Sequence, residues 1–231
     1  MRIKWLADAD AVAREGARFI AEEARAAVAA RGIFIAAVSG GRTPWLMFRA
    51  LAEEDVPWSA LRFAQVDERV APAESDERNL RHLRENLLGR AALRPEQICA
   101  MPVESPDLDA AARSYASEIQ KLAGSPAVLD LVHLGLGSDG HTASLVAGDP
   151  VLEVTDRDVA ATGVYQGRRR MTLTYPILNR ARRILWVVTG KEKSAMLTRL
   201  RNGDPSIPAG RVCRDRAIVL ADLAVRQVDF P

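Results

Sequence analysis

A histidine in a glycine-rich loop is the residue of this sequence whose setting most suggests chemistry. His141 stands in LVHLGLGSDGHTASL (residues 131–145), after an apolar run and a turn with three glycines. An imidazole with an ordinary pKa of about 6.5 accepts a proton readily at neutral pH, and Asp139 stands where it could orient the ring. Packing explains a histidine in such a loop less easily than one on a helix face. The segment therefore makes His141 a candidate general base with Asp139 as its partner, although the loop alone leaves a non-catalytic histidine the commoner case.

The same loop has a second interpretation. Gly135-x-Gly137-x-x-Gly140 has the spacing of a dinucleotide-binding fingerprint, and two acids at 156 and 158 stand near the usual offset of a ribose-binding carboxylate. The fingerprint needs a long helix beginning at its third glycine. Here the segment HTASLVA is interrupted by Gly-Asp-Pro at 148–150 after about two helical turns. The dinucleotide interpretation is therefore disfavoured but stays open.

The segment SGGRTP (residues 39–44) predicts a place for an anion. Gly40 and Gly41 let backbone amides approach a ligand, Thr43 can cap the helix that follows, and Pro44 suits its first position. The start of a helix is electropositive, so these residues could form a phosphate cradle. A tight turn with a good helix cap explains the same residues equally well.

Basic residues stand near three further element ends. Arg69, in Asp-Glu-Arg at 67–69, could pair bidentately with a phosphate. The run Arg168–Arg170 carries no interleaved aromatic residues, which disfavours nucleic-acid binding and favours a solvated strand start. Lys191 and Lys193 open a helix, where a cation is unfavourable to the helix dipole. That position hints that one of them faces a bound anion, although a surface lysine is the commoner explanation.

The other two histidines are predicted to be structural. His82 falls off the apolar face of its helical segment, which indicates a solvated surface residue. His133 lies within an apolar strand, where a hydrogen-bonded core histidine is the expected role.

Apolar runs and helical patterns alternate along the chain. Strands are expected at 33–38, 61–66, 128–137, 158–164, 170–178 and 183–190, and helices at 8–31, about 44–54, 77–88, 107–123 and from about 191 to 201. Residues 217–225 are expected to form the last strand and a short final helix. This alternation predicts an α/β fold with a mostly parallel, doubly wound sheet flanked by helices. No linker or repeat divides the chain, so residues 1–231 are expected to form a single domain. Ligands of such sheets bind outside the carboxyl ends of the strands.

Composition excludes several functional classes. The chain has 231 residues, and its 32 basic and 30 acidic side chains leave a net charge of +2, too small for a general nucleic-acid binder. Two cysteines without CxxC spacing indicate reduced thiols rather than a disulfide or zinc framework. No signal peptide or membrane-spanning run is evident. We therefore expect a cytoplasmic protein without nucleic-acid or membrane partners.

Together these segments resemble one family, the 6-phosphogluconolactonases, within the larger group that shares the glucosamine-6-phosphate isomerase fold. The similarity extends over nearly the whole chain, and the DGHTASL loop is its most specific part. The matching segments are VSGGRTP (38–44), DERVAP (67–72) with Ser75, Asp76 and Asn79 downstream, GLGSDGHTASL (135–145), RRMTLTYPILNRAR (169–182), VTGKEKSAML (188–197), PSIPAGRV (205–212) and DLA (222–224).

The resemblance implies hydrolysis of 6-phospho-D-glucono-1,5-lactone to 6-phosphogluconate in the oxidative pentose phosphate pathway. It implies His141 as the catalytic base, with Asp139 beside it. The implied substrate-binding residues are Gly40, Gly41, Thr43, Asp67, Arg69, Arg170 and Lys193. No metal or cofactor is implied, and the chain is expected to be a monomer or a homodimer.

The sequence departs from the family pattern at several places. His133 stands where an apolar residue is usual, Arg78 where a serine is frequent, and VYQGRRR (164–170) replaces a proline-rich stretch. Val146-Ala147 replaces the common Phe-Pro. The related amino-sugar phosphate deaminases need an acidic residue after the histidine loop, and Ser144-Leu145-Val146 supplies none. A non-catalytic sugar-phosphate binder on the same fold is the other alternative.

Overall fold

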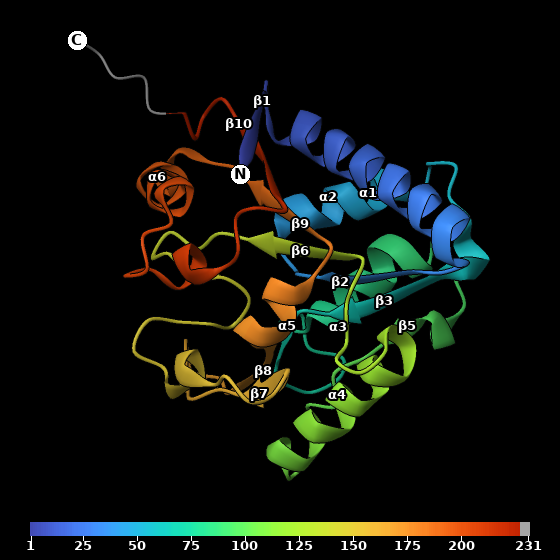
Figure 1. Cartoon of the computed structure of the whole chain (residues 1–231), viewed down its shortest axis with the longest axis vertical. Coiled ribbons are helices and arrows are strands. Elements are labelled where there is room, and N and C mark those ends of the chain that lie inside the picture. Colours follow the sequence, from blue (N-terminus) through green and yellow to red (C-terminus); the bar gives the residue numbers. More distant parts are fainter. Residues whose placement is uncertain (227–231) are drawn as a thin grey trace.

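A seven-stranded, all-parallel sheet forms the centre of the computed structural model, which describes residues 1–226 (Figure 1). The apolar runs of the sequence become its inner strands, since a strand covered on both faces needs apolar side chains on both. In order across the sheet, the strands are β1 (Arg2–Leu6), β10 (Ala217–Asp222), β9 (Arg183–Val188), β6 (Leu131–Gly135), β2 (Phe34–Val38), β3 (Leu61–Gln65) and β5 (Ile98–Cys99).

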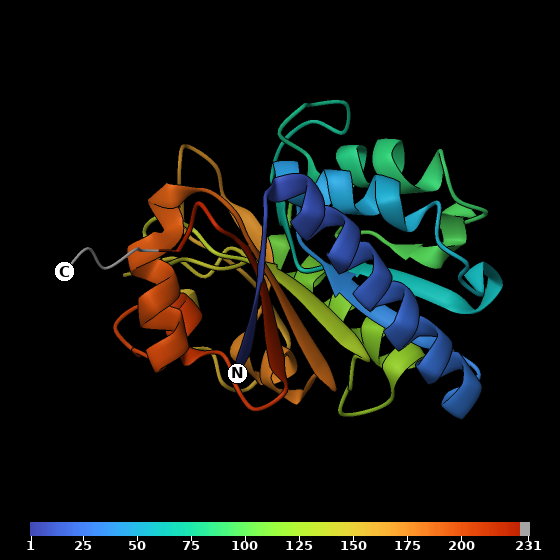
Figure 2. The same cartoon turned by 90° about the horizontal axis from the view of Figure 1, so that it is seen from above.

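Helices cover both faces of this sheet. The longest, α1 (Ala9–Arg31), begins at Asp8, whose carboxylate accepts the Ala11 amide at 2.8 Å, and ends at Gly32 in the left-handed region. Figure 2 shows α1 lying across one face of the twisted sheet. The other helices are α2 (Arg42–Leu51), α3 (Asn79–Leu83) continued by a π-helical turn at Arg84–Leu88, α4 (Leu108–Ala123), α5 (Tyr175–Arg180) and α6 (Ser194–Asn202). Short 3₁₀ turns occupy Trp58–Ala60, Pro95–Gln97, Pro150–Glu153, Lys191–Lys193 and Pro208–Arg211.

A small antiparallel sheet lies beside the large one. Its strands are β4 (Asp67–Arg69), β8 (Arg170–Leu173) and β7 (Val159–Ala161), with β8 in the middle. Arg69 pairs with Arg170 across β4 and β8, and Asp67 pairs with Thr172. Because side chains alternate along a strand, these four project from one face, while Met171 and Leu173 project from the other.

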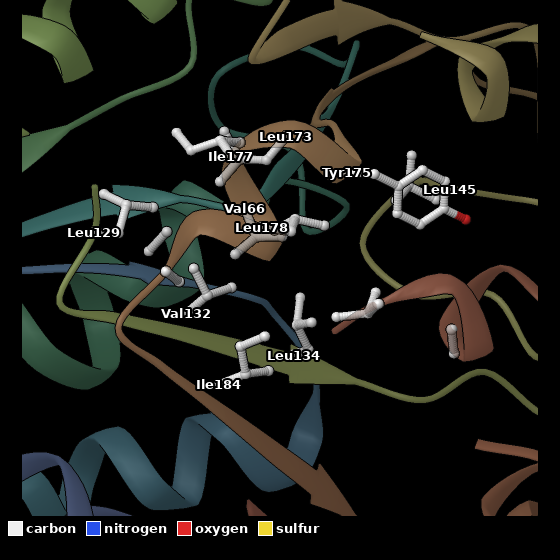
Figure 3. Packing of buried hydrophobic residues seen from close by; sticks show 14 of the residues in the cluster. Val66, Leu129, Val132, Leu134, Leu145, Leu173, Tyr175, Ile177, Leu178 and Ile184 are labelled. Atoms are coloured by element: carbon white, nitrogen blue, oxygen red, sulfur yellow. The ribbon is translucent and has the colours of Figure 1, made fainter. Parts of the chain in front are cut away.

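One apolar cluster connects the two sheets. Met171 and Leu173 of β8 are fully buried in the same cluster as Val132 and Leu134 of β6. Figure 3 shows Leu173 beside Ile177 and Leu178 of α5, with Val132, Leu134 and Ile184 of the large sheet below them. A second cluster lies under α1 and α2 on the opposite face of the large sheet. The small sheet is thereby held at a fixed place against the large one.

The prediction of an α/β fold with a mostly parallel sheet is confirmed. The predicted strand at 170–178 is wrong beyond residue 173, because the chain turns there into α5. Pro176 lies in the first turn of that helix, where the missing amide hydrogen costs no hydrogen bond. Neither edge strand, β1 or β5, was expected, and neither was the antiparallel pairing of the small sheet.

The C-terminal end also differs from the expectation. The last strand ends at Asp222, and residues 223–226 form a turn. The short final helix expected within residues 217–225 is therefore wrong, because the chain after the strand forms only this turn. Within residues 1–226, no helix is both long enough and apolar enough to cross a membrane.

The strand order reverses between β2 and β6. From β2 the chain continues outward through β3 and β5, and from β6 it continues the other way through β9 and β10. Loops that follow the two central strands therefore diverge and leave a crevice at the carboxyl edge of the sheet, where ligands of such folds bind.

Candidate active site

A cavity of about 410 Å³ opens at this crevice. Its size lies in the range of roughly 300–1,000 Å³ that is usual for small-molecule sites. The loops after β2 and β6 supply two of its walls, and the polar face of the small sheet supplies a third. Its lining consists of Ser39, Gly40, Gly41, Arg42, Trp45, Asp67, Arg69, Asp76, Asn79, Gly135, Leu136, Gly137, His141, Ala143, Arg170 and Lys193.

His141 and Asp139 form the closest polar pair of the loop after β6. The Nδ1 atom of His141 lies 2.6 Å from Oδ1 of Asp139, and the same oxygen accepts the His141 backbone amide at 3.2 Å. His141 lines the cavity, whereas Asp139 lies behind it. A Cβ atom at Gly137 would overlap the imidazole and the carboxylate, so only glycine leaves room for the pair there.

The carboxylate of Asp139 is held in its ionised form. Partial burial acts to raise its pKa, but hydrogen bonds from the ring and amide of His141 and from the Tyr165 hydroxyl outweigh this and lower it. An ionised carboxylate at Nδ1 places the proton of a neutral imidazole on that nitrogen. Nε2 then carries the lone pair, and among the described residues it makes no hydrogen bond.

The geometry of this loop removes the dinucleotide interpretation. Gly140 adopts a φ of 86°, and the chain continues into a tight turn in which Thr142 and Leu145 form an isolated bridge. No helix begins at the third glycine. The loop therefore lacks the helix N-terminus on which a bound pyrophosphate would rest.

The glycine turn after β2 leads into the start of α2. Gly41, with φ of 130°, is the N-cap, and Arg42 is the first helical residue. The predicted cap by Thr43 is therefore wrong, and Pro44 occupies the third helical position rather than the first. The Thr43 hydroxyl is bonded to that of Thr189 at 2.8 Å. The amides of Arg42 and Thr43 lie in the first turn, where no intrahelical acceptor exists.

Four cations line the cavity, against two carboxylates. Arg42, Arg69, Arg170 and Lys193 face Asp67 and Asp76. Arg170 is almost fully buried, contrary to a solvated strand start, while the nearby Arg169 is exposed. Lys193, not Lys191, reaches the cavity, as the resemblance implied. The excess of positive charge suits an anionic ligand.

Asp67 lies at the floor of the cavity. It accepts a hydrogen bond from the Ser144 hydroxyl at 2.6 Å. Burial raises the pKa of Asp67, and the Ser144 hydrogen bond and the charges of Arg170 and Arg69 oppose that rise without cancelling it. The cavity therefore contains a desolvated carboxyl group beside two arginines.

The neighbouring Glu68 has a purely structural environment. This fully buried carboxylate accepts hydrogen bonds from the amides of Arg69, Asn79 and Leu80, at 2.8–2.9 Å. Arg78, the departure from the family pattern, is also buried, and its Nε lies 3.3 Å from Glu68. The pair fixes the segment that carries Asp67 and Arg69 at one end and Asn79 at the other.

Of the predictions for the two remaining histidines, the one for His133 is confirmed and the one for His82 is wrong. His133 is fully buried as expected, and its Nδ1 accepts the Ser39 amide at 3.2 Å, although its Nε2 has no partner among the described residues. The prediction of a solvated His82 is wrong, because its ring stacks on Trp45 with 4.0 Å between centroids. Helical periodicity placed His82 off the apolar face but could not reveal an aromatic partner on another helix.

Comparisons with known proteins show the family to which this chain belongs. Residues 7–220 match the family model for glucosamine-6-phosphate isomerases/6-phosphogluconolactonase. The chain belongs to that family. It is 37% identical over 175 residues to a 6-phosphogluconolactonase of Synechocystis, covering 74% of this chain and 72% of the relative. It is 34% identical to one of Mycobacterium bovis, covering 95% of each. The crystal structure of a 6-phosphogluconolactonase from Thermotoga maritima superposes with a TM-score of 0.85 at 29% identity, covering 96% of this chain and 98% of that one.

Within this family frame, the structure brings most of the predicted site residues to one cavity. Gly40, Gly41, Asp67, Arg69, Arg170, Lys193 and His141 line it. Asp139 reaches it only through His141, and the Thr43 side chain points to Thr189.

Sequence reasoning missed several lining residues. Arg42, Trp45, Asp76 and Asn79 were not assigned to the site. Asn79 donates to the Asp67 carbonyl at 3.1 Å, and a Cβ atom at Gly40 would overlap its side chain. Asp76 and Asn79 belong to a segment that carried the family resemblance, which was the available signal. Trp45 had none, since its position reads as an ordinary apolar residue of a helix.

Proposed function

We propose that this chain hydrolyses 6-phospho-D-glucono-1,5-lactone to 6-phosphogluconate, with a water molecule activated by His141. The observation that carries the proposal is the His141–Asp139 pair at 2.6 Å, with His141 on the wall of a cavity whose lining has more cations than carboxylates. Relatives that carry the name 6-phosphogluconolactonase, including one aligned over 95% of this chain, support the substrate.

The proposed base is the Nε2 atom of His141. It removes a proton from water as the water oxygen bonds to the lactone carbonyl carbon. The tetrahedral intermediate then collapses, the bond between that carbon and the ring oxygen breaks, and the imidazolium returns its proton to the departing oxygen. Asp139 stabilises the imidazolium that forms between the two steps. Base catalysis of this kind contributes about 10²–10⁴-fold, a modest factor that suits an activated ester.

The phosphate of the substrate is proposed to lie at the start of α2. The Gly40 and Gly41 turn and the free amides of the first helical turn, Thr43 among them, would cradle it. Arg69, Arg170 and Lys193 would supply the countercharge. Asp67, beside Arg170, is proposed to accept a hydrogen bond from a sugar hydroxyl.

A coupled assay of freshly generated 6-phosphogluconolactone tests this function. We expect lactonase activity in the wild-type chain and a fall in kcat of about 10²–10⁴-fold in His141→Ala. Glucosamine 6-phosphate, the substrate of the deaminase alternative, should give no turnover. Near-normal lactonase activity in His141→Ala would exclude the proposed base. Because no metal is part of this mechanism, EDTA should leave the rate unchanged.

The same assay distinguishes the proposed lactonase from a non-catalytic sugar-phosphate binder. A sugar-phosphate binder on this fold would bind 6-phosphogluconate without accelerating lactone hydrolysis. The intact Asp139–His141 pair favours the enzyme, since a binding module has no need of an oriented imidazole whose second nitrogen lacks a protein partner.

A further inference from the structure

A hairpin with a two-residue turn brings Tyr165 beside His141, which lines the cavity. It connects β7 to β8, and Tyr165 and Arg168 pair at its base, with the Tyr165 amide donating to the Arg168 carbonyl at 2.9 Å. The two turn residues, Gln166 and Gly167, both have positive φ, of 52° and 76°. Consecutive positive φ values are those of a type I′ turn, whose twist matches that of the flanking strands. The turn therefore gives Tyr165 a defined direction.

The hairpin is also tied to the segment between β4 and α3. The guanidinium of Arg168 contacts the Glu77 carboxylate through two nitrogens, at 2.7 and 3.0 Å. The Glu77 carbonyl in turn accepts a hydrogen bond from Arg69 at 2.7 Å. The base of the turn is thus fixed both by its own backbone pairing and by this ion pair, although it lies at the protein surface.

Tyr165 reaches the catalytic pair from this turn. Its hydroxyl donates to Oδ2 of Asp139 at 3.0 Å, while Oδ1 of the same carboxylate faces His141. The rings of Tyr165 and His141 meet edge to face, with 5.6 Å between centroids. Both oxygens of Asp139 are therefore engaged, and the carboxylate is held in one orientation. Burial and the bond to Asp139 raise the pKa of Tyr165, so its hydroxyl keeps its proton and acts as a donor.

The other side of the Tyr165 ring supports a cation of the cavity. The guanidinium carbon of Arg170 lies 5.0 Å from the ring centroid, within the range of a cation–π contact. Gln166 links the two groups, since its amide nitrogen contacts the Tyr165 hydroxyl and its amide oxygen contacts Arg170, both at 3.3 Å. The Tyr165 side chain thus contacts both the His141–Asp139 pair and Arg170, the arginine proposed to bind phosphate.

We infer that Tyr165 is a positioning residue with two separable parts: its hydroxyl orients Asp139 against His141, and its ring orients Arg170. The inference rests on the proposed lactonase function. It gives a role to the VYQGRRR segment, where this chain departs from the pattern of the family.

The two parts predict different kinetics. Tyr165→Phe keeps the ring and loses the hydroxyl, so kcat on the lactone should fall about tenfold, as expected for loss of a hydrogen bond to a charged group, with KM unchanged. Tyr165→Leu loses both, so kcat should fall similarly and KM should also rise about threefold, as expected for loss of a cation–π contact. In an Asp139→Asn background, Tyr165→Phe should change kcat by less than about twofold, because the hydroxyl acts through that carboxylate.

Tyr175→Phe is the matched control. Tyr175 also donates its hydroxyl to a protein acceptor, the Pro208 carbonyl at 2.9 Å, and also lies under an arginine, Arg211 at 4.8 Å, but it is outside the cavity. The Tyr175→Phe substitution should lower the melting temperature and leave kcat and KM unchanged.

A measurement that needs no substrate turnover tests this inference independently of the proposed lactonase function. Nitrogen-15 NMR of the His141 ring should show the proton on Nδ1 in the wild type and a mixture of tautomers in Tyr165→Phe. If the wild type fails to hydrolyse the lactone, the proposed function fails while this test still applies. A wild-type kcat or an unchanged tautomer in Tyr165→Phe, or effects that add fully to those of Asp139→Asn, would overturn the inference.

Discussion

The position of the His141 imidazole depends on Gly137, because only a residue without a side chain leaves room for it. Gly137 is not in a left-handed conformation, and its constraint is purely spatial: a methyl group there would occupy the space of the His141 and Asp139 side chains. The glycine that resembles part of a nucleotide-binding fingerprint is thus explained by the proximity of an acid and a base.

Gly137→Ala should therefore remove most of the activity without unfolding the protein. A displaced base of about 1 Å can cost on the order of 100-fold in rate, so we expect a fall in kcat of that size. Steady-state kinetics with circular dichroism measures both effects. Gly89→Ala is the control, because its added methyl group would meet neighbours only at ordinary contact distance, away from the cavity. A Gly137→Ala enzyme with unaltered kcat would show that the pair tolerates displacement.

The cations of the cavity should act on binding rather than on the chemical step. Arg69→Ala and Lys193→Ala should each raise KM about tenfold or more and leave kcat within about threefold, because the phosphate is bound equally in ground and transition states. Initial rates over a range of lactone concentrations measure the two constants. If kcat falls while KM stays constant, the phosphate is not bound by these side chains.

At the scale of elements, β6 and the turn after β2 are joined through His133. Its Nδ1 accepts the Ser39 amide, and the Ser39 hydroxyl donates to the His133 carbonyl at 3.1 Å. The same serine begins the proposed phosphate-binding turn. Burial lowers the pKa of His133 to about 3, so the ring stays neutral in the folded protein throughout the physiological range.

This buried ring should make the protein sensitive to acid. Below its ordinary pKa of about 6.5 the unfolded chain binds a proton at His133, whereas the folded chain does not until pH falls to about 3. Stability is therefore lost as pH falls through this window, by up to about 1.4 kcal/mol per pH unit. Between pH 7 and 4.5, wild type should lose about 2–3 kcal/mol more than His133→Leu, as measured by urea denaturation. Parallel losses in the two proteins would contradict the neutral buried ring.

The sequence predicted the elements better than their contacts. The alternation of Arg170 and Thr172 with Met171 and Leu173 was legible, and it correctly separated a polar from an apolar face. The pairing of that strand with β4 was not, because antiparallel partners more than a hundred residues apart leave no local pattern. Thr43 illustrates the same limit: its type suits a cap, but the chain begins the helix earlier, at Gly41.

The candidate site was predictable where a residue contradicts its surroundings. His141 in a glycine loop is explained less easily by packing, whereas Arg69 at a strand end was assigned to the site only through the family resemblance. Trp45 and Tyr165 are not anomalous in sequence, since aromatic residues are ordinary in helices and hairpins. Their roles follow only from their contacts in the folded chain: Trp45 stacks on His82, and Tyr165 donates a hydrogen bond to Asp139.

For the whole molecule, the cavity lies between two sheets that share one core. Gly40 and His141 come from loops of the large sheet, while Asp67, Arg69 and Arg170 come from the small one. A ligand that contacts both groups links two parts of the fold, and any ligand that binds only the folded state stabilises it by mass action.

The product 6-phosphogluconate should therefore stabilise the protein against unfolding. At a concentration about 100 times its Kd the gain is about 2.7 kcal/mol, detectable as a rise in melting temperature. Gluconate, which lacks the phosphate, should give little effect. His141→Ala should retain most of the gain and Lys193→Ala should lose it. Equal stabilisation by gluconate would argue against a phosphate cradle.

The connection between β7 and β8 is separate in sequence from the loop that carries the acid–base pair. The pair resides on a loop after a central strand, whereas residues 162–169 connect two strands of a small outer sheet and turn at Gln166 and Gly167. Insertions in such a turn disturb no buried strand and cost little loop-closure entropy. Lengthening this turn would act on the reacting groups only through Tyr165, and a library of such insertions would vary their positioning while their own loop keeps its sequence.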